Sequence, residues 1–507
     1  MSALRIISSA FISVWHKESL EKIAEALKKL DIQIYSTGGT ADFIEKHKIP
    51  VVRVESLTGY PSILGGRVKT LHPKIFGGIL ARRDVDSDNT ELEKYGIPHV
   101  DLVITDLYPF EATVAEGASD KEVIEKIDIG GISLIRAAAK NFRDVLIIPS
   151  RDHYPALLEI LEKKEGSTTI GERKKLAGEA FRISSLYDTA INNWFAGTES
   201  DSFSVTFRNG RKLRYGENPH QSAVYYEDEG APFRQLHGKE ISYNNLLDID
   251  AACQLIAEFG EITFAILKHN NACGLASAGD LCSAYKAALA GDPVSAFGGV
   301  LVTNREVDQA TAAETDKLFF EVIIAPGYSD EALEILKRKK NRIILVTDNV
   351  TLPDKIIRTV TGGILLQDRD SRTESASCLE VVTHTSPDER ERADLLFANK
   401  IVKHTKSNAI VLSKNNQLIG SGAGQTSRID ALRHALEKAR NGGFDTNGAV
   451  MASDAFFPFA DSVEIANEAG ITTVIQPGGS VRDMDSIDFC NQHNMKMVFT
   501  GVRHFRH

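Results

Sequence analysis

Hydrophobic residues in the first 150 positions alternate between short apolar runs and stretches with helical spacing. Leu20, Ile23, Leu27 and Leu30 lie three or four residues apart, which predicts an amphipathic helix over residues 17–30. Runs rich in Val, Ile and Leu predict strands at 11–14, 32–35, 51–54, 101–105 and 144–148. Strands that alternate with helices are typical of a parallel α/β sheet.

The pattern changes once along the chain and then returns to the α/β type. Residues 154–196 are helical and polar, which predicts connecting helices with a boundary near residues 198–203. Beyond the boundary, a helix is predicted over 429–440, and strands at 262–267, 409–412, 449–452 and 472–475. We therefore predict an α/β protein with two domains, 1–198 (a core over 1–150 plus the connecting helices) and 199–507. The sequence leaves open whether the second half is a duplicated fold.

The composition is that of a globular protein without a nucleic-acid partner. A length of 507 residues suffices for two to four domains, and 42% hydrophobic with 25% charged residues is ordinary for a globular fold. The 69 acidic side chains outnumber the 59 basic ones, which gives a net charge of −10. Because a general nucleic-acid binder usually has a basic surface, we expect no such partner.

Cysteine usage and the N-terminal segment indicate the compartment. The five cysteines are scattered and include no Cys-x-x-Cys pair, as expected of free thiols in a reducing compartment. The sequence contains no signal-peptide pattern and no apolar run long enough to span a bilayer. We therefore expect a cytoplasmic protein without a membrane partner.

A glycine-rich loop near the N-terminus suggests a phosphate-binding site. The segment Thr37-Gly38-Gly39-Thr40 follows a predicted strand and begins a helix. Glycines let the backbone amides approach an anion at a helix N-terminus, and the hydroxyl groups add donors. A tight strand-to-helix turn in which Thr40 only caps the helix explains the same segment equally well.

A second loop gathers four basic side chains within eight residues: Arg67, Lys69, His72 and Lys74. A charge run is usually a solvated surface, but this one lies between two pairs of glycines, which favours a loop bent around an anion. Val68 precedes Lys69 where a P-loop requires glycine. ATP or GTP hydrolysis is therefore not expected.

Three further residues in this region are candidates for proton transfer. Tyr108 follows the strand at 101–105, where its hydroxyl can pack or polarise a carbonyl. Asp128 precedes a helix on which Arg136 and Lys140 lie one turn apart on the same face. Tyr, Asp and Lys side chains are common general acids and bases.

The second half contains its own cluster of chemically distinctive residues. The octapeptide 214–221 combines a cation, an aromatic ring, a glycine, amides and a histidine, a combination that no structural rule requires. Lys268 and His269 follow an apolar strand, so both emerge at its end, where a general base beside a cation explains them better than an isolated surface histidine. Glycine-rich loops at 292–299 and 420–428 add Asp, Ser and Arg side chains.

Two classes of cofactor site are not supported. The loop at 420–428 lacks the GxGxxG spacing of dinucleotide-binding proteins, which argues against NAD. His269 is followed two positions later by Asn271, and Cys273 has no Cys-x-x-Cys partner, which excludes a deaminase-type zinc site. We predict no metal site.

In order and spacing, the two clusters resemble the bifunctional AICAR transformylase/IMP cyclohydrolase family of purine biosynthesis. The resemblance covers essentially the whole chain and is most specific at residues 67–73, 128–141, 214–221 and 422–428. It implies an N-terminal methylglyoxal-synthase-like domain and a C-terminal pair of cytidine-deaminase-like subdomains. It also implies the last two steps of IMP synthesis, formyl transfer to AICAR giving FAICAR and dehydrative ring closure of FAICAR to IMP.

The resemblance assigns site residues by motif position. In the cyclohydrolase site it implies proton transfer or polarisation by Tyr108, Asp128 and Lys140, and nucleotide contacts from Lys17, Thr37, Gly38, Gly39, Thr40, Arg67, Val68, Lys69, Thr70, Thr105, Asp106, Ile129 and Gly130. In the transformylase site it implies Lys268 and His269 as the catalytic pair, and substrate contacts from Arg214, Tyr215, Gly298, Glu321, Asn408, Arg428, Phe456, Asp461, Ser480, Val481 and Arg503.

The implied chemistry uses 10-formyltetrahydrofolate as a co-substrate and needs neither a metal nor a tightly bound cofactor. His269 removes a proton from the weakly nucleophilic amino group of AICAR, while Lys268 stabilises the developing oxyanion. Ring closure is intramolecular and depends on holding one conformer near attack geometry. The implied partners are AICAR, FAICAR, IMP and folate, with a homodimer whose interface holds the transformylase site.

Three positions depart from the family pattern. Trp15-His16 stands where Ser-Asp is usual, Asp106 replaces an Asn, and Ala272 replaces a Pro after the Lys-His pair. None of these changes removes a proposed catalytic group.

Two alternative functions use the first cluster alone. One is a non-catalytic nucleotide-binding regulatory protein, since fold does not fix function, and the other is a lyase acting on a sugar phosphate. Both leave residues 214–221 and the Lys268-His269 pair without a role, so we rank them below the bifunctional enzyme.

Overall fold

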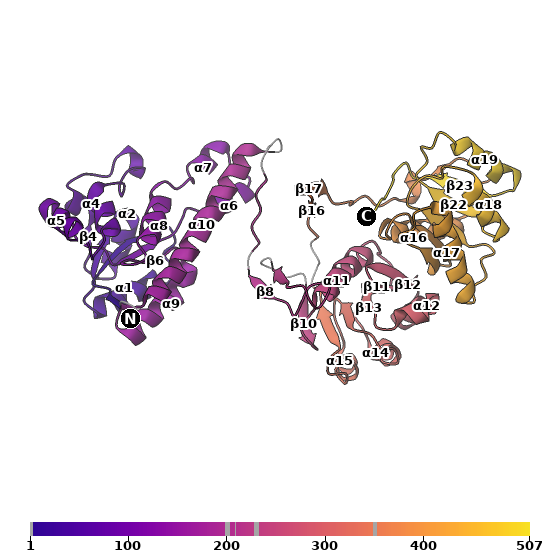
Figure 1. The fold of residues 1–507 in the computed structure, drawn as a ribbon, viewed down its shortest axis with the longest axis horizontal. Helices are drawn as coiled ribbons and strands as arrows, with labels where there is room; N and C mark the ends of the chain where they lie inside the picture. The colour runs from indigo at the N-terminus through magenta and orange to yellow at the C-terminus, as the bar shows by residue number, and fades with distance from the viewer. Residues whose placement is uncertain (1–3, 198–202, 208, 228–232, 348–351) are drawn as a thin grey trace. The chain divides into compact units, whose positions relative to one another are not determined.

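The computed structural model describes residues 4–197, 203–207, 209–227, 233–347 and 352–507. The chain forms two compact units, residues 1–206 and residues 207–507 (Figure 1). The predicted boundary between residues 198 and 199 lies outside the described residues. Each unit has a hydrophobic core of its own.

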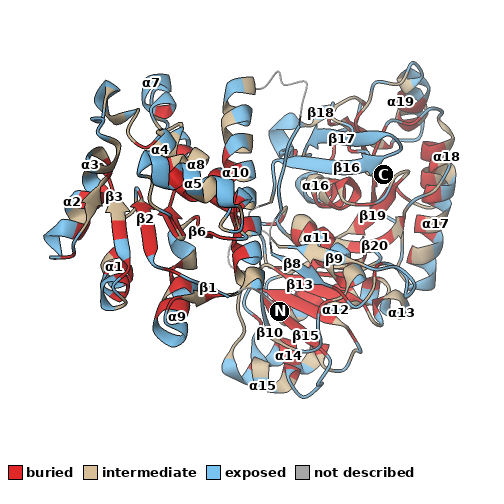
Figure 2. Ribbon diagram, turned by 60° about the vertical axis from the view of Figure 1, so that its left-hand side comes forward, coloured by how far each residue is buried: buried red, intermediate tan, exposed pale blue. Residues whose placement is uncertain are grey.

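A five-stranded parallel sheet forms the centre of the N-terminal unit, in the order β4-β3-β2-β5-β6. Its strands are β2 (Ser9–Ser13), β3 (Gln33–Ser36), β4 (Val52–Arg53), β5 (Leu102–Thr105) and β6 (Leu146–Ile148), and a separate antiparallel pair joins β1 (Arg5–Ile6) to β7 (Ser167–Thr168). The predicted parallel α/β sheet is thus confirmed, although the run at 51–54 is a strand over only two residues. Strands β2, β5 and β6 are buried (Figure 2), which explains their continuous apolar runs.

Helices surround this sheet as the periodicity predicts. They are α1 (Leu20–Lys29), α2 (Gly38–Lys46), α3 (Val54–Thr58), α4 (Pro73–Leu80), α5 (Asp86–Tyr95), α6 (Phe110–Ala115), α7 (Asp120–Ile124), α8 (Gly130–Lys140), α9 (Tyr154–Lys164) and α10 (Ile170–Ala196). Leu20, Ile23 and Leu27 of α1 are buried, which confirms the predicted face. The predicted connecting helices are α9 and α10, and α10 begins at a capping box made by Thr169 and Glu172.

A twelve-stranded sheet forms the centre of the C-terminal unit, in the order β10-β15-β14-β13-β11-β12-β20-β19-β21-β22-β23-β18. Its strands are β10 (Arg234–His237), β11 (Thr263–Lys268), β12 (Asn271–Ser277), β13 (Val300–Thr303), β14 (Val322–Ala325), β15 (Ile343–Val346), β18 (Glu380–Val381), β19 (Ile410–Lys414), β20 (Gln417–Gly422), β21 (Val450–Ser453), β22 (Thr473–Gln476) and β23 (Lys496–Phe499). All four strands predicted for this half are present.

The large sheet contains the same strand arrangement twice. In the first half, the hairpin β11–β12 is followed by β13, antiparallel to β11, and then by β14 and β15, which run parallel to β13. In the second half, the hairpin β19–β20 is followed in the same way by β21, β22 and β23. The halves meet where Ala276 of β12 pairs with Gln417 of β20. The C-terminal unit is therefore a duplicated fold, which the sequence had left open.

The remaining elements of this unit include helices on both halves and two small hairpins. The helices are α11 (Tyr243–Ile256), α12 (Leu281–Gly291), α13 (Pro293–Ala296), α14 (Gln309–Thr315), α15 (Asp330–Leu336), α16 (Glu389–Lys403), α17 (Arg428–Asn441), α18 (Asp461–Glu468) and α19 (Asp483–Gln492). The small hairpins are β8 (Gly210–Lys212) with β9 (Val224–Tyr226), and β16 (Lys355–Val360) with β17 (Gly363–Asp368). Every residue of β16 and β17 is exposed (Figure 2).

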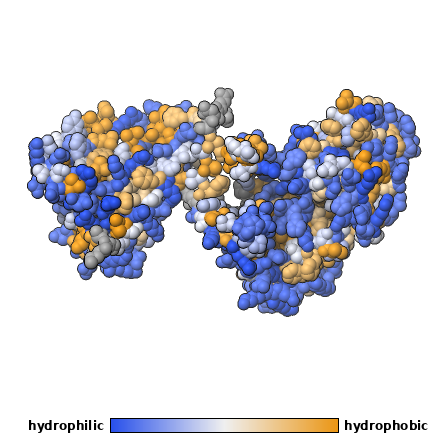
Figure 3. All heavy atoms as spheres, in the orientation of Figure 1, coloured by the Kyte–Doolittle hydropathy of each residue, from blue (hydrophilic) through white to orange (hydrophobic). Residues whose placement is uncertain are grey.

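The surface of both units is mainly hydrophilic on the face drawn in Figure 3, with smaller hydrophobic clusters between polar residues. Over the described part of the chain, no helix combines the length and the apolar character needed to cross a membrane.

Candidate functional site

A cavity of about 690 Å³ opens at the carboxyl ends of β2, β3 and β5 in the N-terminal unit. Ligands of parallel α/β folds bind at this edge. The cavity brings together thirteen of the predicted cyclohydrolase residues: Lys17, Thr37, Gly39, Thr40, Arg67, Lys69, Thr70, Thr105, Asp106, Tyr108, Asp128, Ile129 and Gly130. Gly38 and Val68 belong to the same loops but do not line the cavity.

Lys17 is fixed inside this cavity by oxygen acceptors. Its Nζ donates to Val14 O, to Trp15 O at 3.3 Å and to Thr40 Oγ1 at 3.2 Å. Burial lowers the pKa of Lys17, and the carboxylate of Asp106 opposes this effect. Among the described residues, no side chain caps the first turn of the neighbouring helix α2, so its amides are available to a phosphate.

Asp106 holds the first loop of the cavity, where the sequence departs from the family. Its carboxylate accepts hydrogen bonds from the backbone N–H groups of Trp15 and His16, the latter at 2.9 Å. It also lies 2.8 Å from His16 Nδ1. The two departures at positions 16 and 106 are therefore partners in one hydrogen-bonded contact, in which the ring of His16 meets the carboxylate that Asp106 adds.

Asp128 and Tyr108 lie in the same cavity in surroundings that favour their protonated forms. Burial raises the pKa of Asp128, although backbone N–H groups of Gly131 and Tyr108 oppose this, the Gly131 N to Asp128 Oδ1 distance being 2.6 Å. Burial raises the pKa of Tyr108 as well, with further contributions from Asp128 and Asp106. A carboxyl group with a raised pKa can give and take protons near neutral pH.

Lys140 does not line this cavity. It is the last residue of α8, whereas Asp128 precedes the helix, and a helix of this length spans about 15 Å. Lys140 lies instead in a groove of about 560 Å³ between α8 and α10, with Arg136, Lys174 and Phe181. The sequence grouped Lys140 with Asp128 because both belong to one loop–helix segment and one family motif, and its catalytic role stays a prediction.

Two cavity residues were not singled out in the sequence. Glu125 forms an ion pair with Arg67, and the Lys126 ammonium lies 4.3 Å from the centre of the Trp15 ring. Both come from the segment after α7. Their charges alternate within an ordinary polar stretch, so no sequence signal distinguished them from surface residues.

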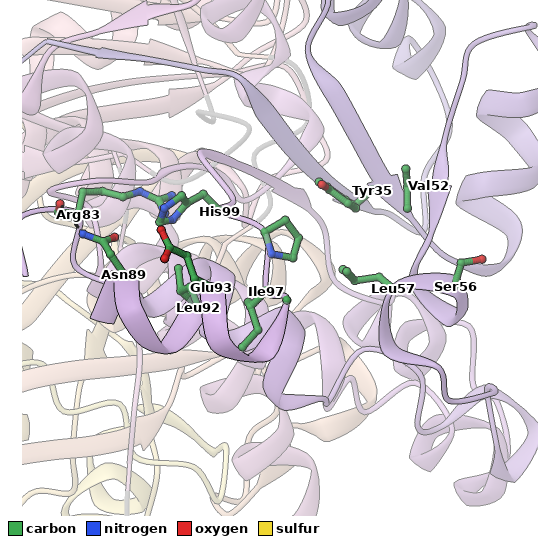
Figure 4. Close-up of a pocket in the computed structure, with 12 residues that line it drawn as sticks. Tyr35, Val52, Ser56, Leu57, Arg83, Asn89, Leu92, Glu93, Ile97 and His99 are labelled. Atoms are coloured by element: carbon green, nitrogen blue, oxygen red, sulfur yellow. Dashed lines mark hydrogen bonds between the residues drawn. The ribbon is translucent and has the colours of Figure 1, made fainter. Parts of the chain in front are cut away.

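The N-terminal unit also has a larger cavity, of about 1030 Å³, that contains none of the predicted residues. Figure 4 shows Arg83, Glu93 and His99 at one end and Tyr35 and Val52 at the other. The Arg83 guanidinium is already engaged, because it donates to Val100 O at 2.9 Å and to Asp101 at 3.1 Å. Cavity size alone therefore does not identify the active site.

In the C-terminal unit, strand directions place the predicted residues from 268 onward at one edge of the large sheet. Lys268 and His269 follow β11, and Gly298 and Glu321 precede β13 and β14, which begin at the same edge. The residues from the second half lie around the ends of β19 to β23 at that edge: Asn408, Arg428, Phe456, Asp461, Ser480, Val481 and Arg503. The duplicated topology thus explains how residues far apart in sequence share one edge.

The predicted catalytic pair, Lys268 and His269, lies beside a small cavity, and Lys268 is hydrogen-bonded to the backbone. Lys268 Nζ donates to Phe297 O at 2.7 Å, beside Gly298, and Lys268 and His269 line a cavity of about 220 Å³. Glu321 receives Lys239 Nζ at 2.9 Å and Asn245 Nδ2 at 3.3 Å. Lys268 and Glu321 are therefore held in place before any substrate binds.

Asn408 and Arg428 form a polar group in the second half. The Arg428 guanidinium donates to Asn408 Oδ1 at 3.1 and 3.2 Å and pairs with Asp454 at 3.1 Å. Burial lowers the pKa of Arg428, and Asp454 opposes this effect. The C-terminal tail with Arg503 joins this group, since His504 N donates to Asp454 O at 3.0 Å.

Several of the other predicted transformylase residues are exposed, while Tyr215, Asp461 and Ser480 are half-buried. Phe456 and Val481 are exposed. Arg214 is exposed too, stacks on Tyr215 at 5.5 Å, and lies in a loop that contacts the start of α11 through Asn244 Nδ2 and Glu217 O, 3.2 Å apart. Exposed side chains at an implied substrate site are open to a ligand or to another chain.

No group of three or more His, Cys, Asp or Glu side chains in the described part of the chain is arranged to hold a metal ion. All five cysteines are free thiols.

Comparisons with known proteins identify the family of the chain. The AICARFT/IMPCHase bienzyme family model matches residues 138–438, and the MGS-like domain model matches residues 19–133. The bifunctional purine biosynthesis protein PurH of Bacteroides thetaiotaomicron is 59% identical over all 507 residues and covers 100% of both chains. The protein of the same name from Aquifex aeolicus is 49% identical over 98% of this chain and 100% of its own. The solved crystal structure of ForH is 36% identical over 37% of this chain and 99% of that chain, with a TM-score of 0.33.

Proposed function

The chain belongs to the AICARFT/IMPCHase bienzyme family, and we propose that each of its compact units holds one of the two active sites. It is a bifunctional enzyme of purine biosynthesis, an AICAR formyltransferase and an IMP cyclohydrolase. We assign the cyclohydrolase to a domain of residues 1–198 and the transformylase to residues 199–507. The cysteines, all free thiols, support a cytoplasmic location for both steps.

In the N-terminal unit, the cavity residues account for ring closure. The amides at the start of α2 and the cations Lys17, Arg67 and Lys69 bind the nucleotide phosphate. The Tyr108 hydroxyl polarises the formyl oxygen, and Asp128 takes the proton from the attacking carboxamide nitrogen and passes it to that oxygen, which becomes a hydroxyl. The hydroxyl then leaves as water with the proton of the former formamide nitrogen, and the ring C=N bond forms. Because the reaction is intramolecular, holding FAICAR in one conformer lowers much of the barrier.

In the C-terminal unit, the Lys268-His269 pair accounts for formyl transfer from 10-formyltetrahydrofolate. His269 takes the proton of the AICAR amino group as that nitrogen attacks the formyl carbon, and Lys268 stabilises the oxyanion. The oxyanion collapses, and the folate nitrogen leaves with the proton that His269 took, so the formyl group remains on AICAR as FAICAR. No metal and no tightly bound cofactor take part in this proposal.

A homodimer completes the transformylase site in our proposal. From β11 to β22 the sheet order crosses five strand-to-strand steps, which places Ser480 and Val481 about 24 Å along the edge from Lys268. We propose that a second copy brings its own residues to each site, so that contacts separated along one sheet edge meet at the interface. The exposed apolar residues of β16 and β17 offer a surface for that copy: Ile356, Ile357, Val360, Ile364, Leu365 and Leu366.

The observation that carries the assignment is that Asp128 and Tyr108 share a cavity in one compact unit while Lys268 and His269 lie in the other. Separate assays of the two half-reactions test it. We expect His269→Ala to make no FAICAR from AICAR and yet to cyclise added FAICAR at the wild-type rate. We expect Asp128→Asn to accumulate FAICAR. If one of these substitutions abolished both half-reactions while the protein stayed folded, the proposal of two separate sites would be wrong.

Lys140→Ala tests the remaining motif-based prediction. If Lys140 acts in ring closure, the variant accumulates FAICAR as Asp128→Asn does. The matched control is Lys174→Ala, which removes a neighbouring cation from the same groove. Wild-type cyclisation by Lys140→Ala would remove Lys140 from the mechanism without affecting the roles of Asp128 and Tyr108.

A further inference from the structure

His269 occupies a strained two-residue turn. It and Asn270 connect β11 to β12, where Lys268 pairs with Asn271, and both turn residues have positive φ, +51° and +65°. Positive φ at both central positions defines a type I′ turn, a conformation that residues other than glycine adopt at a cost. Contacts from outside the hairpin are therefore needed to hold the His269 ring in one place.

Asp248 makes the first of these contacts. It lies in the second turn of α11, and its Oδ1 accepts the Asn270 N–H at 2.7 Å. Burial raises the pKa of Asp248, while the Asn270 N–H group and the nearby His269 lower it. The side chain thus ties the turn that carries His269 to a packed helix.

Asn271 makes the second contact, from the other side of the turn. Its Nδ2 donates to His269 O at 2.9 Å, and its Oδ1 accepts the Lys406 N–H at 3.0 Å. Lys406 lies two residues before Asn408, in the segment that leads into β19. The His269 backbone is therefore tied to both halves of the C-terminal unit.

The second half contains an equivalent turn, held by an aspartate at the equivalent position. Asn415 and Asn416 connect β19 to β20 with φ of +55° and +53°, and Asp394 of α16 accepts their N–H groups at 2.9 and 2.6 Å. The turn residues are 146 positions apart (415 minus 269), and so are the aspartates (394 minus 248). The helix caps Ser242 and Asp388, each with a capping box, are also 146 apart.

Comparing the two halves shows which part of the Asp248 contact is structural and which part serves the proposed catalysis. Both halves use an aspartate from the preceding helix to hold a type I′ turn, so the contact belongs to the fold. Only the first turn carries a histidine, since Asn415 stands in its place in the second. The first half therefore uses a turn-stabilising contact to position a general base.

We propose that Asp248 and Asn271 are positioning residues that hold His269 for formyl transfer. This inference rests on the proposed role of His269 and assigns neither residue a contact with substrate. Asp248 fixes the turn against α11, and Asn271 fixes its backbone against the Lys406 segment. Loss of either contact lets the turn relax toward ordinary φ values and moves the imidazole away from the attacking amino group.

Steady-state assays of Asp248→Ala and Asp248→Asn test the proposal in the full-length protein. We expect Asp248→Ala to lower the transformylase kcat about tenfold to a hundredfold, the effect of losing a hydrogen bond to a charged group, with little change in the KM for AICAR. Asp248→Asn keeps an acceptor oxygen and should recover most of the lost kcat. Cyclisation of added FAICAR, measured on the same samples, should remain at the wild-type rate.

Asp394→Ala is the matched control for Asp248→Ala, because it removes the carboxylate from the equivalent turn, which lacks the catalytic pair. We expect it to lower the unfolding temperature of the C-terminal unit and to leave the transformylase kcat within about twofold of wild type. Should Asp248→Ala fail to fold, Asn271→Ala gives an independent measurement with the same expected loss of kcat.

Two results would overturn the positioning role. One is a wild-type transformylase kcat in Asp248→Ala or Asn271→Ala. The other is an equal loss of kcat in Asp394→Ala, which would show a general effect of loosening the fold. Full transformylase activity in His269→Ala would instead contradict the proposed function itself, so the two failures are distinguishable.

Discussion

At the scale of single residues, the structure explains why unusual side chains are tolerated in the cyclohydrolase cavity. A buried carboxylate is costly unless it is paired and hydrogen-bonded. Asp106 meets this requirement through His16 and the backbone N–H groups of the first loop. His16 and Asp106, which depart from the family pattern at distant positions of the sequence, contact each other in the fold.

This pairing predicts a specific double-mutant result. His16→Asp places a second carboxylate against Asp106, and like charges at this distance repel by several kcal/mol at an effective dielectric near 20. We expect kcat/KM for FAICAR cyclisation to fall about tenfold or more. Adding Asp106→Asn removes one of the two charges and should restore most of the loss. Equal activities for the single and double variants would show that the two positions are not coupled.

His504 predicts a pH dependence of stability in the C-terminal unit. Burial lowers the pKa of His504, but hydrogen bonds and charges of Asp370 and Glu374 outweigh it and raise the pKa from 6.5 to about 9. A folded-state pKa above the unfolded value stabilises fully below pH 6.5, and the stabilisation disappears as the pH rises through about 9. The shift corresponds to ~3 kcal/mol.

Urea unfolding of the C-terminal unit between pH 6 and 10 measures this effect. His504→Gln keeps a polar side chain but does not titrate, so its stability should change less with pH. Parallel pH profiles for the wild type and His504→Gln would contradict the prediction.

At the scale of elements, the hydrophobic pattern predicted long elements better than short ones. Strands such as β2, β5 and β11 have consecutive buried residues, and that local signal identifies them. Of the run at 51–54, only Val52 and Arg53 form a strand, because two residues of pairing with β3 suffice at the sheet edge and α3 begins at Val54. The hairpin β16–β17 was not predicted, since its apolar residues contribute to neither core.

The exposed hairpin predicts a surface for self-association. Leu365→Asp places a charge among apolar side chains that a second copy would cover. We expect the variant to shift toward monomer in analytical ultracentrifugation and to lose transformylase activity by about tenfold or more. Thr359→Asp, which adds the same charge at an exposed polar position of β16, is the control and should remain dimeric. A monomeric wild-type protein with full transformylase activity would contradict the homodimer proposal.

At the scale of the whole molecule, the two compact units to which we assign the two activities have separate cores. The core of the N-terminal unit uses residues 7–180, and the core of the C-terminal sheet begins at residue 241. A unit with its own core can fold alone.

This separation predicts that residues 1–206, expressed alone, fold and cyclise FAICAR. We expect kcat within about threefold of the full-length protein, because every described cavity residue comes from that unit. The fragment should show no formyl transfer from AICAR. A fragment that is unfolded by circular dichroism would show that the C-terminal unit is needed for the stability of the N-terminal one.

The sequence by itself determined the α/β class, most of the long elements and the loops that supply charge. It also indicated the Lys268-His269 pair at a strand end, because strand ends and glycine loops are encoded by neighbouring residues. The tertiary structure decided which distant residues meet. It placed Lys140 away from Asp128, joined His16 to Asp106, and set Asp248 beneath the turn of His269. These contacts depend on strand order and helix packing, which local patterns do not specify.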